Sequence, residues 1–125
     1  MTGQVLERRP LLNIVFRLEE MPNLGIEFVV DTGFTDFLTL PPEAVSALRL
    51  PFSHRAYGTL ADGNPIEFDV YAATVLWNDE ECLVPVVATG RRPLLGTSLL
   101  EQHELKIEFV EKGKVSITPM EKNEE

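Results

Sequence analysis

Short apolar runs separated by turn residues recur along the chain, and this pattern predicts β-strands rather than long helices. The first two runs are Leu11–Leu18 and Gly25–Val30, and the segment between them contains Pro22, which favours a turn. The second run is apolar almost continuously up to Asp31. We therefore expect a β-hairpin whose second strand leads directly into Asp31.

The rest of the chain continues this pattern and adds two short helices. Later strands are predicted at Phe37–Leu40, Tyr57–Leu60, Pro65–Val70, Asp69–Trp77, Cys82–Ala88, Glu104–Val110 and Lys114–Thr118. Pro42 suits the first turn of a helix, and Glu43–Leu48 contains good helix formers. A second helix is predicted after Thr97, its N-cap, with Glu101 inside it. Closely spaced strands with intervening turns predict an all-β fold, either a barrel or a sandwich.

The chain has 125 residues, which fits a single domain over residues 1–125 with frayed ends at 1–9 and 120–125. Asp and Glu number 20 against 11 Lys and Arg, so the net charge of −9 disfavours nucleic acid as a partner.

A lone cysteine, Cys82, cannot form an intramolecular disulfide or a Cys-based zinc cluster. Residues 1–10 lack a signal-peptide core, and no apolar run reaches the ~20 residues that cross a bilayer. We expect a cytoplasmic protein that uses no metal, cofactor or membrane.

An acidic residue directly after an apolar strand and shortly before a glycine is an unusual place for a purely structural carboxylate. Burial of the strand would disfavour the ionised form of Asp31, so the carboxylate needs a hydrogen-bond donor nearby. The local candidates are the backbone N–H of Gly33 and a neighbouring hydroxyl group, and Gly33 also allows a tight turn. The simpler interpretation is that Asp31-Thr32-Gly33 is only a turn between two strands.

A second segment far downstream completes a recognisable pair of motifs. In Pro93–Leu100 two leucines meet Gly96, and a short helix is predicted to follow. Together with the apolar run that ends in Asp31-Thr32-Gly33, this segment resembles the retropepsin-like aspartic proteases, especially small prokaryotic members. The resemblance extends from about residue 11 to residue 118. It implies a retropepsin-like acid protease barrel in which the Gly96 segment packs under the loop that carries Asp31.

The resemblance also implies the site. Asp31, Thr32 and Gly33 are the expected catalytic residues, and Phe34 and Leu95 are expected to line the substrate cleft. A hairpin between the two motifs corresponds to the flap that covers a bound peptide. The expected flap contacts with substrate are Thr59, Leu60, Ala61, Asp62 and Gly63.

Aspartic protease chemistry needs two carboxylates that share one proton, and this chain offers only one suitable aspartate. The other aspartates are not followed by Thr-Gly or Ser-Gly. We therefore expect a homodimer that places two copies of Asp31 on a twofold axis, with Thr32 hydrogen-bonded across it as the resemblance implies. Viral members carry an Asp and an Arg where this chain has Thr35 and Thr97. The absence of both charges leaves no buried charge unpaired.

Three interpretations of the chain are compatible with these observations. The first is a homodimeric aspartic endopeptidase that acts on peptides or unfolded proteins. The second is a non-catalytic peptide-binding or dimerisation module on the same fold, since a fold does not define an activity. The third is an unrelated small β-sandwich with Asp31 on the surface of a monomer.

Overall fold

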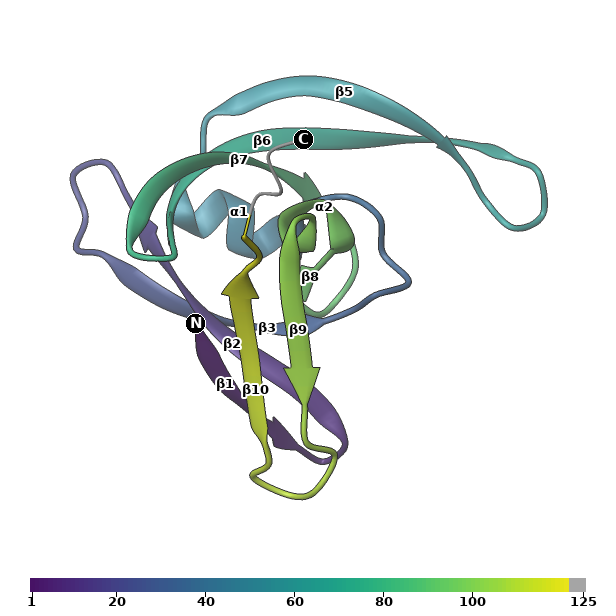
Figure 1. The fold of residues 1–125 in the computed structure, drawn as a ribbon. Helices are drawn as coiled ribbons and strands as arrows, with labels where there is room; N and C mark the ends of the chain where they lie inside the picture. Colours follow the sequence, from purple (N-terminus) through teal and green to yellow (C-terminus); the bar gives the residue numbers. More distant parts are fainter. Residues whose placement is uncertain (122–125) are drawn as a thin grey trace.

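The computed structural model describes residues 1–121 as ten strands and two short helices (Figure 1). The strands are β1 (Thr2–Leu6), β2 (Arg9–Arg17), β3 (Leu24–Val30), β4 (Leu38–Leu40), β5 (Phe52–Thr59), β6 (Pro65–Trp77), β7 (Glu80–Ala88), β8 (Leu94–Leu95), β9 (His103–Ile107) and β10 (Lys114–Pro119). The helices are α1 (Pro42–Leu48) and α2 (Thr97–Leu100). The all-β class with two short helices is confirmed.

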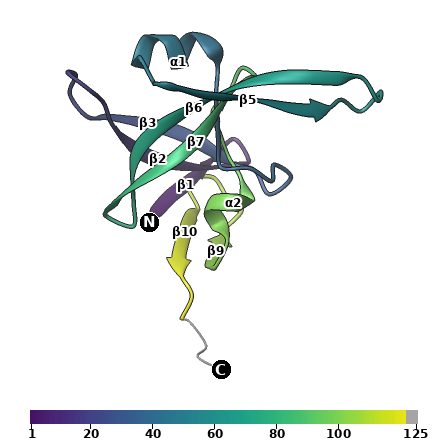
Figure 2. The ribbon, with the colours of Figure 1, turned by 90° about the horizontal axis from the view of Figure 1, so that it is seen from above.

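All ten strands belong to one curled sheet. Their order is β5-β6-β7-β4-β8-β3-β2-β1-β10-β9, and β6 also pairs with β2. Because of this additional pairing, β6, β7, β4, β8, β3 and β2 form a closed ring, which makes the body a small barrel. Strands β1, β10 and β9 continue beyond the ring as a three-stranded antiparallel extension. The β5–β6 hairpin projects away from the body in both views (Figures 1 and 2).

The core fills the barrel with alternate residues of its strands. On β2, Leu12, Ile14 and Phe16 are fully buried, while the residues between them are exposed or half-buried. The Phe16 ring stacks on the Phe28 ring of β3 at a centroid distance of 5.9 Å. This inward–outward alternation is the one expected of a β-strand with one buried face. The core therefore fixes the register of the strand that carries Asp31.

The N-terminal end differs from the prediction. Residues 1–9 were expected to be frayed, but Thr2–Leu6 is strand β1, which lies between β2 and β10. Its only buried side chain is that of Val5, so the segment carries little apolar signal of its own. It forms a hairpin with β2, and its other edge pairs with residues of β10 that lie more than 100 positions away, which local patterns cannot reveal. Residues 122–125 of the other predicted frayed end lie outside the described residues.

Smaller differences concern the ends of elements. Gly96 rather than Thr97 is the N-cap of α2, and the helix ends at Leu100, so Glu101 is its C-cap. Strand β9 ends at Ile107 rather than at Val110, because the chain turns earlier than the Lys112-Gly113 signal indicates. The two strands predicted at 65–70 and 69–77 form one strand of 13 residues, β6.

Candidate active site

The short strand β8 organises the centre of the molecule. It lies between β3 and β4, parallel to the first and antiparallel to the second. Leu95 faces Val30 on one side and Leu38 on the other. Since Val30 ends β3 and Leu38 begins β4, the loop 31–37 must cross directly over the chain that leaves β8. The two motifs that are distant in sequence are therefore packed together, as the resemblance implied.

Backbone hydrogen bonds fasten the loop 31–37 to the segment 95–98. They run from Asp31 N–H to Leu95 O (2.9 Å), from Gly96 N–H to Phe37 O (2.9 Å), from Thr97 N–H to Phe34 O (2.8 Å) and from Ser98 N–H to Asp36 O (3.1 Å). Four such bonds over seven residues hold the loop at both ends and in its middle. The position of the Asp31 main chain is thus set by a long-range contact and not by the turn alone.

The Asp31 carboxylate is oriented by its own loop. Its Oδ1 atom accepts a hydrogen bond from Gly33 N–H at 2.9 Å, and its carbonyl oxygen accepts one from Phe34 N–H at 3.1 Å. The side chain is half-buried, whereas Thr32 and Gly33 are exposed. The predicted partnership between Asp31 and Gly33 is confirmed. This arrangement leaves Oδ2 as the oxygen available for a water molecule or a second carboxylate.

The close packing under the loop depends on Gly96. A Cβ atom placed there would overlap the carbonyl oxygen of Asp36 and would lie 2.6 Å from the Phe34 ring and 2.7 Å from the Phe34 carbonyl oxygen. Only glycine allows the two segments to approach so closely. Phe34 is half-buried and covers Gly96, so part of its ring supports the loop and does not face an open cleft.

Two hydroxyl groups that sequence reasoning did not assign also hold this site. Ser98 Oγ donates a hydrogen bond to the Thr35 carbonyl oxygen at 2.7 Å, which adds a side-chain contact to the backbone bonds of α2. Thr39 is buried, and its Oγ1 accepts a hydrogen bond from Leu94 N–H at 3.1 Å. Both act on backbone atoms more than 50 positions away. Their roles could not be seen from neighbouring residues.

Leu95 corrects one of the predicted cleft residues. Its side chain is 0% exposed and belongs to the hydrophobic core cluster. Residues on a strand point alternately to opposite sides, and in this two-residue strand it is Leu95 that points inward while Leu94 is half-buried. The two leucines look equivalent in sequence, so only the register of β8 distinguishes them. Leu95 supports the loop from below and does not line a cleft.

The predicted flap residues lie at the tip of the β5–β6 hairpin. Thr59, Leu60, Ala61, Asp62 and Gly63 are all exposed. Asp62 closes the tip, because its Oδ1 accepts a hydrogen bond from Asn64 N–H at 3.0 Å. Gly63 has a φ of +87°, which favours glycine. The hairpin projects on the same side of the body as the loop between β3 and β4 (Figures 1 and 2).

A hollow lies beside the loop 31–37, on the side of α2 and β9. Its volume is about 570 Å³, and four of its lining residues carry hydroxyl groups. It is lined by Thr32, Thr35, Thr97, Ser98, Leu100, Glu101 and Leu105. Thr35 and Thr97 therefore lie at one surface, although neither carries a charge. The hollow begins at the residue next to Asp31 and ends at β9.

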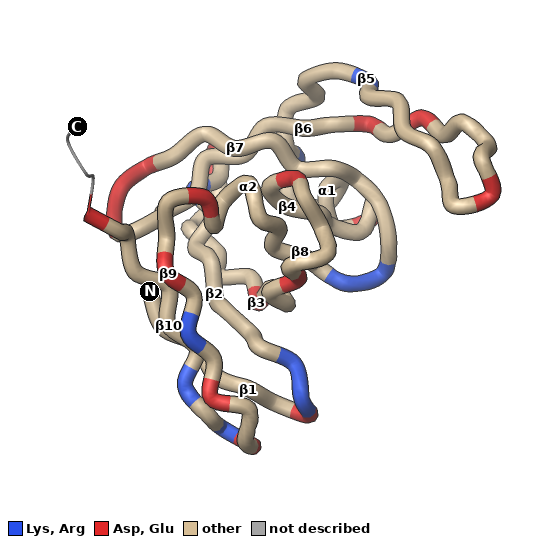
Figure 3. Tube along the Cα trace, turned by 45° about the vertical axis from the view of Figure 1, so that its right-hand side comes forward, with Lys and Arg blue, Asp and Glu red and all other residues tan. Residues whose placement is uncertain are grey.

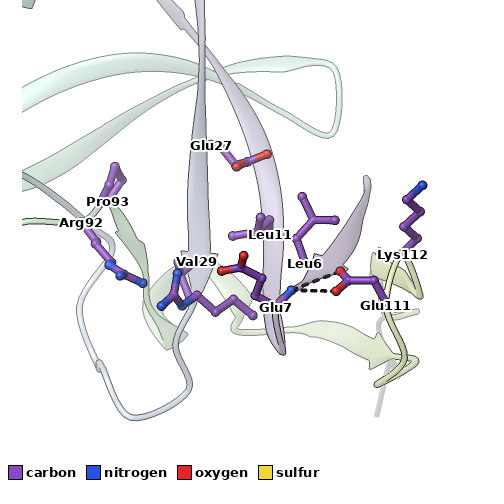
Figure 4. A pocket seen from close by; sticks show the side chains of 10 residues that line it. Leu6, Glu7, Leu11, Glu27, Val29, Arg92, Pro93, Glu111 and Lys112 are labelled. Carbon is purple, nitrogen blue, oxygen red and sulfur yellow. Dashed lines mark hydrogen bonds between the residues drawn. The ribbon is translucent and has the colours of Figure 1, made fainter.

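Another groove contains none of the predicted site residues. It has a volume of about 530 Å³ and lies at the turn between β1 and β2 (Figure 4). Its charged residues are balanced, with Glu7, Glu27 and Glu111 against Arg9, Arg92 and Lys112. The Glu111 carboxylate there accepts a hydrogen bond from Glu7 N–H at 3.1 Å. This hydrogen bond stabilises the turn between β1 and β2, and the lining residues do not suggest a reactive centre.

Charges elsewhere are distributed unevenly. Acidic positions mark the tip of the β5–β6 hairpin, and both signs alternate along the β9–β10 hairpin (Figure 3). Within residues 1–121, no cluster of three His, Cys, Asp or Glu side chains could hold a metal ion. No helix among the same residues is long and apolar enough to cross a membrane.

Comparison with known proteins identifies the fold. A crystal structure of a retropepsin-like aspartic protease from Rickettsia conorii matches the chain with a TM-score of 0.56 and 21% sequence identity. The match covers 94% of this chain and 90% of that one. No protein-family model and no curated protein sequence matches the chain. The chain therefore has the retropepsin-like fold, and the resemblance that its motifs predicted is confirmed at that level.

Proposed function

We propose that the protein is an aspartic endopeptidase that works as a homodimer. The observation that carries this proposal is the Asp31 carboxylate, which is half-buried, oriented by Gly33 N–H and placed at the end of a core strand. A structural carboxylate would not need a loop that is fastened by four backbone bonds and leaves one oxygen free. The retropepsin-like fold supports the same interpretation.

The proposed reaction uses one Asp31 from each copy. Two carboxylates about 3 Å apart cannot both ionise easily, so they share one proton. The ionised carboxylate takes a proton from a water molecule, whose oxygen attacks the carbonyl carbon of the peptide bond. The protonated carboxylate donates its proton to the carbonyl oxygen. Collapse of the tetrahedral intermediate breaks the C–N bond, and the leaving nitrogen receives a proton from the pair. One hydroxyl of the intermediate returns its proton to the pair as the new C=O bond forms, so the pair again holds one shared proton.

The other predicted residues have supporting roles in this proposal. Thr32 is exposed beside Asp31 and would hydrogen-bond across the twofold axis. Residues 59–63 would close over an extended peptide and exclude water from the reacting atoms. Phe34 would present the exposed part of its ring to the peptide. We propose peptides or unfolded proteins in the cytoplasm as substrates.

Replacement of Asp31 by asparagine tests the proposal. Asp31→Asn keeps the shape and the hydrogen bond from Gly33 N–H but cannot ionise, so we expect cleavage of unfolded casein to fall to background while the variant remains dimeric. Asp36→Asn is the matched control, because Asp36 lies in the same loop and its Oδ1 accepts only the N–H of Phe37, at 2.9 Å. Cleavage by Asp31→Asn at the wild-type rate would exclude this mechanism. Wild-type protein that binds peptides but never cleaves them would identify a binding module.

A further inference from the structure

A half-buried histidine lies beside the segment that holds the loop 31–37. His103 begins β9 and comes three residues after Leu100, the last residue of α2. Its ring meets the Trp77 ring of β6 edge to face, with 5.5 Å between the centroids and 69° between the planes. Trp77 is 8% exposed and belongs to the hydrophobic core cluster. The imidazole is therefore packed against the core, although the proposed reaction does not use it.

Both nitrogens of the His103 ring form hydrogen bonds within the chain. Nδ1 lies 2.8 Å from the Glu101 carbonyl oxygen, which can only accept, so Nδ1 carries a proton and donates it. Nε2 lies 3.2 Å from Trp77 Nε1, which can only donate, so Nε2 is an acceptor. Asn78 Nδ2 donates to the same nitrogen at 3.1 Å. These partners fit the neutral imidazole with its proton on Nδ1 and no other form of the ring.

No carboxylate stabilises a positive charge on this ring at close range. Within residues 1–121, no Asp or Glu oxygen lies within 4.0 Å of a histidine nitrogen. The charged groups on the neighbouring segments are the Met1 ammonium and the carboxylates of Asp79, Glu80, Glu101, Glu104 and Glu121. The ammonium donates to the Ile117 carbonyl oxygen at 2.9 Å, and all five acidic residues are exposed, where salt and water screen them.

A second proton on the ring would disrupt its contacts. Protonated Nε2 cannot accept from Trp77 or Asn78, and the indole N–H at the edge of the core then loses its partner. A histidine in an unfolded chain takes up this proton as the pH falls below about 6.5, whereas the folded contacts exclude it. Since the folded state binds fewer protons than the unfolded state, stability falls as the pH falls through this range.

The bond from Nδ1 fixes the end of the helix that supports the site. Glu101 is the C-cap of α2, a single turn whose first residues bind the loop 31–37 through Thr97 N–H and Ser98 N–H. Because this turn has only four residues, a displacement of Glu101 is passed on to those contacts and through them to Asp31. The contacts of the imidazole thus lie at one end of the support for the loop.

We propose that His103 is a positioning residue, which in its neutral form fastens the end of α2 to the turn between β6 and β7 and releases it when protonated. This inference rests on the proposed function, because a peptidase needs the loop with Asp31 held in place. A backbone bond from Met120 N–H to Gln102 O, 2.9 Å long, does not depend on the imidazole, so release shifts the helix without unfolding the chain. Acid then lowers cleavage through this contact.

The indole N–H signal in nuclear magnetic resonance spectra tests the contact in the unaltered protein. The chain has one Trp and two His, so Trp77 gives a single indole signal. We expect this signal to move as the pH falls from about 7.5 to about 5, because the bond to His103 is lost. In His103→Gln the amide oxygen accepts the same bond and takes up no proton, so the signal should stay in place. His54→Gln removes the other histidine, which is exposed on β5, and the signal should move as in the wild type.

Unfolding and cleavage provide the second test. Between pH 7 and 5, the folding equilibrium constant of the wild type should fall by up to about 25-fold more than that of His103→Gln, in urea denaturation at one protomer concentration. The ratio of casein cleavage at the two pH values should be at least about threefold in favour of His103→Gln. His103→Ala lacks the contact at every pH, so we expect its kcat at neutral pH to fall severalfold and His103→Gln to keep most of the wild-type value.

Three results would overturn or limit the inference. A wild-type indole signal that does not move, or equal unfolding profiles in the wild type and His103→Gln, would exclude the acid-sensitive contact. Unfolding profiles that differ while cleavage profiles coincide would show that His103 does not position the loop. Failure of the peptidase proposal gives a separate result, in which the indole signals and unfolding profiles differ as expected but neither protein cleaves casein.

Discussion

The loop 31–37 and the tip of the β5–β6 hairpin both connect two strands, but they are held in different ways. The loop 31–37 is bonded to the segment 95–98 by four backbone hydrogen bonds and the Ser98 hydroxyl. The tip at 60–64 is closed by bonds within itself, from Leu60 N–H to Asn64 O and from Gly63 N–H to Leu60 O, each 2.9 Å long. One connection depends on the whole fold, and the other depends only on its own hairpin.

This difference matches what the proposed chemistry asks of each part. Carboxylates that share a proton must stay in place within a fraction of an ångström, which requires support from a rigid core. A flap must open for each substrate, so it must have few contacts that resist opening. Substitutions near the loop should therefore alter stability, whereas those at the tip should alter substrate affinity.

Leu95→Ala should have the largest effect on stability. Removal of this fully buried side chain leaves a cavity under the loop, and we expect the free energy of unfolding to fall by about 2–5 kcal/mol. Leu60→Ala is the matched control at the flap tip, where the side chain is 46% exposed, and we expect a change below about 0.5 kcal/mol. Urea denaturation at one protomer concentration measures both. Equal losses would contradict the contrast between the two regions.

Gly96→Ala should have the next largest effect. The added methyl group overlaps the backbone of the loop 31–37, so we expect the free energy of unfolding to fall by about 1–3 kcal/mol. If the proposed function is correct, the rate of casein cleavage falls as well, because Asp31 is displaced. Gly58→Ala in β5 is the control, because its Cβ would meet only side chains, the Phe68 ring edge at 3.1 Å and Ile66 Cγ2 at 3.8 Å, and these can move. Unfolding curves and casein cleavage are compared for the two variants. Full activity in Gly96→Ala would show that the loop tolerates displacement.

The fold was predictable where local patterns carry the information. The apolar runs 11–18 and 25–30 and the turn residues between them predicted β2 and β3, because strands that border one core are rich in apolar residues. Strand β1 was missed, since it contributes only Val5 to the interior and is ordered by pairing with β10. The early end of β9 was missed for a similar reason. The sequence signal at Lys112-Gly113 shows that a turn exists but not how long it is.

For the candidate site, the sequence indicated the motif that contains Asp31 but not the contacts that hold this motif in place. The hydrogen bond from Gly33 N–H to Asp31 was among those expected, because an acid at the end of an apolar strand requires a donor. The sequence could not show that Leu95 faces the core, because adjacent leucines differ only in register. Nor could it show the bond from Ser98 to Thr35, which joins residues 63 positions apart. Long-range contacts determine these details, and no local rule supplies them.

We expect Asp62→Ala to have the smallest effect on stability and a separate effect on substrate affinity. The Asp62 carboxylate accepts hydrogen bonds from Asn64 N–H at 3.0 Å and from Asn64 Nδ2 at 2.8 Å, and both are exposed. Exposed bonds of this kind contribute little, so the free energy of unfolding should change by less than about 1 kcal/mol.

Without those bonds the tip samples more conformations, and closing it over a peptide costs more entropy. We therefore expect KM for a peptide substrate to rise severalfold while kcat stays near the wild-type value. Asp62→Asn keeps an acceptor oxygen for Asn64 N–H and should restore most of the affinity. If kcat falls instead and KM is unchanged, the tip must act on the chemical step, and the division between a rigid loop and a mobile flap is wrong.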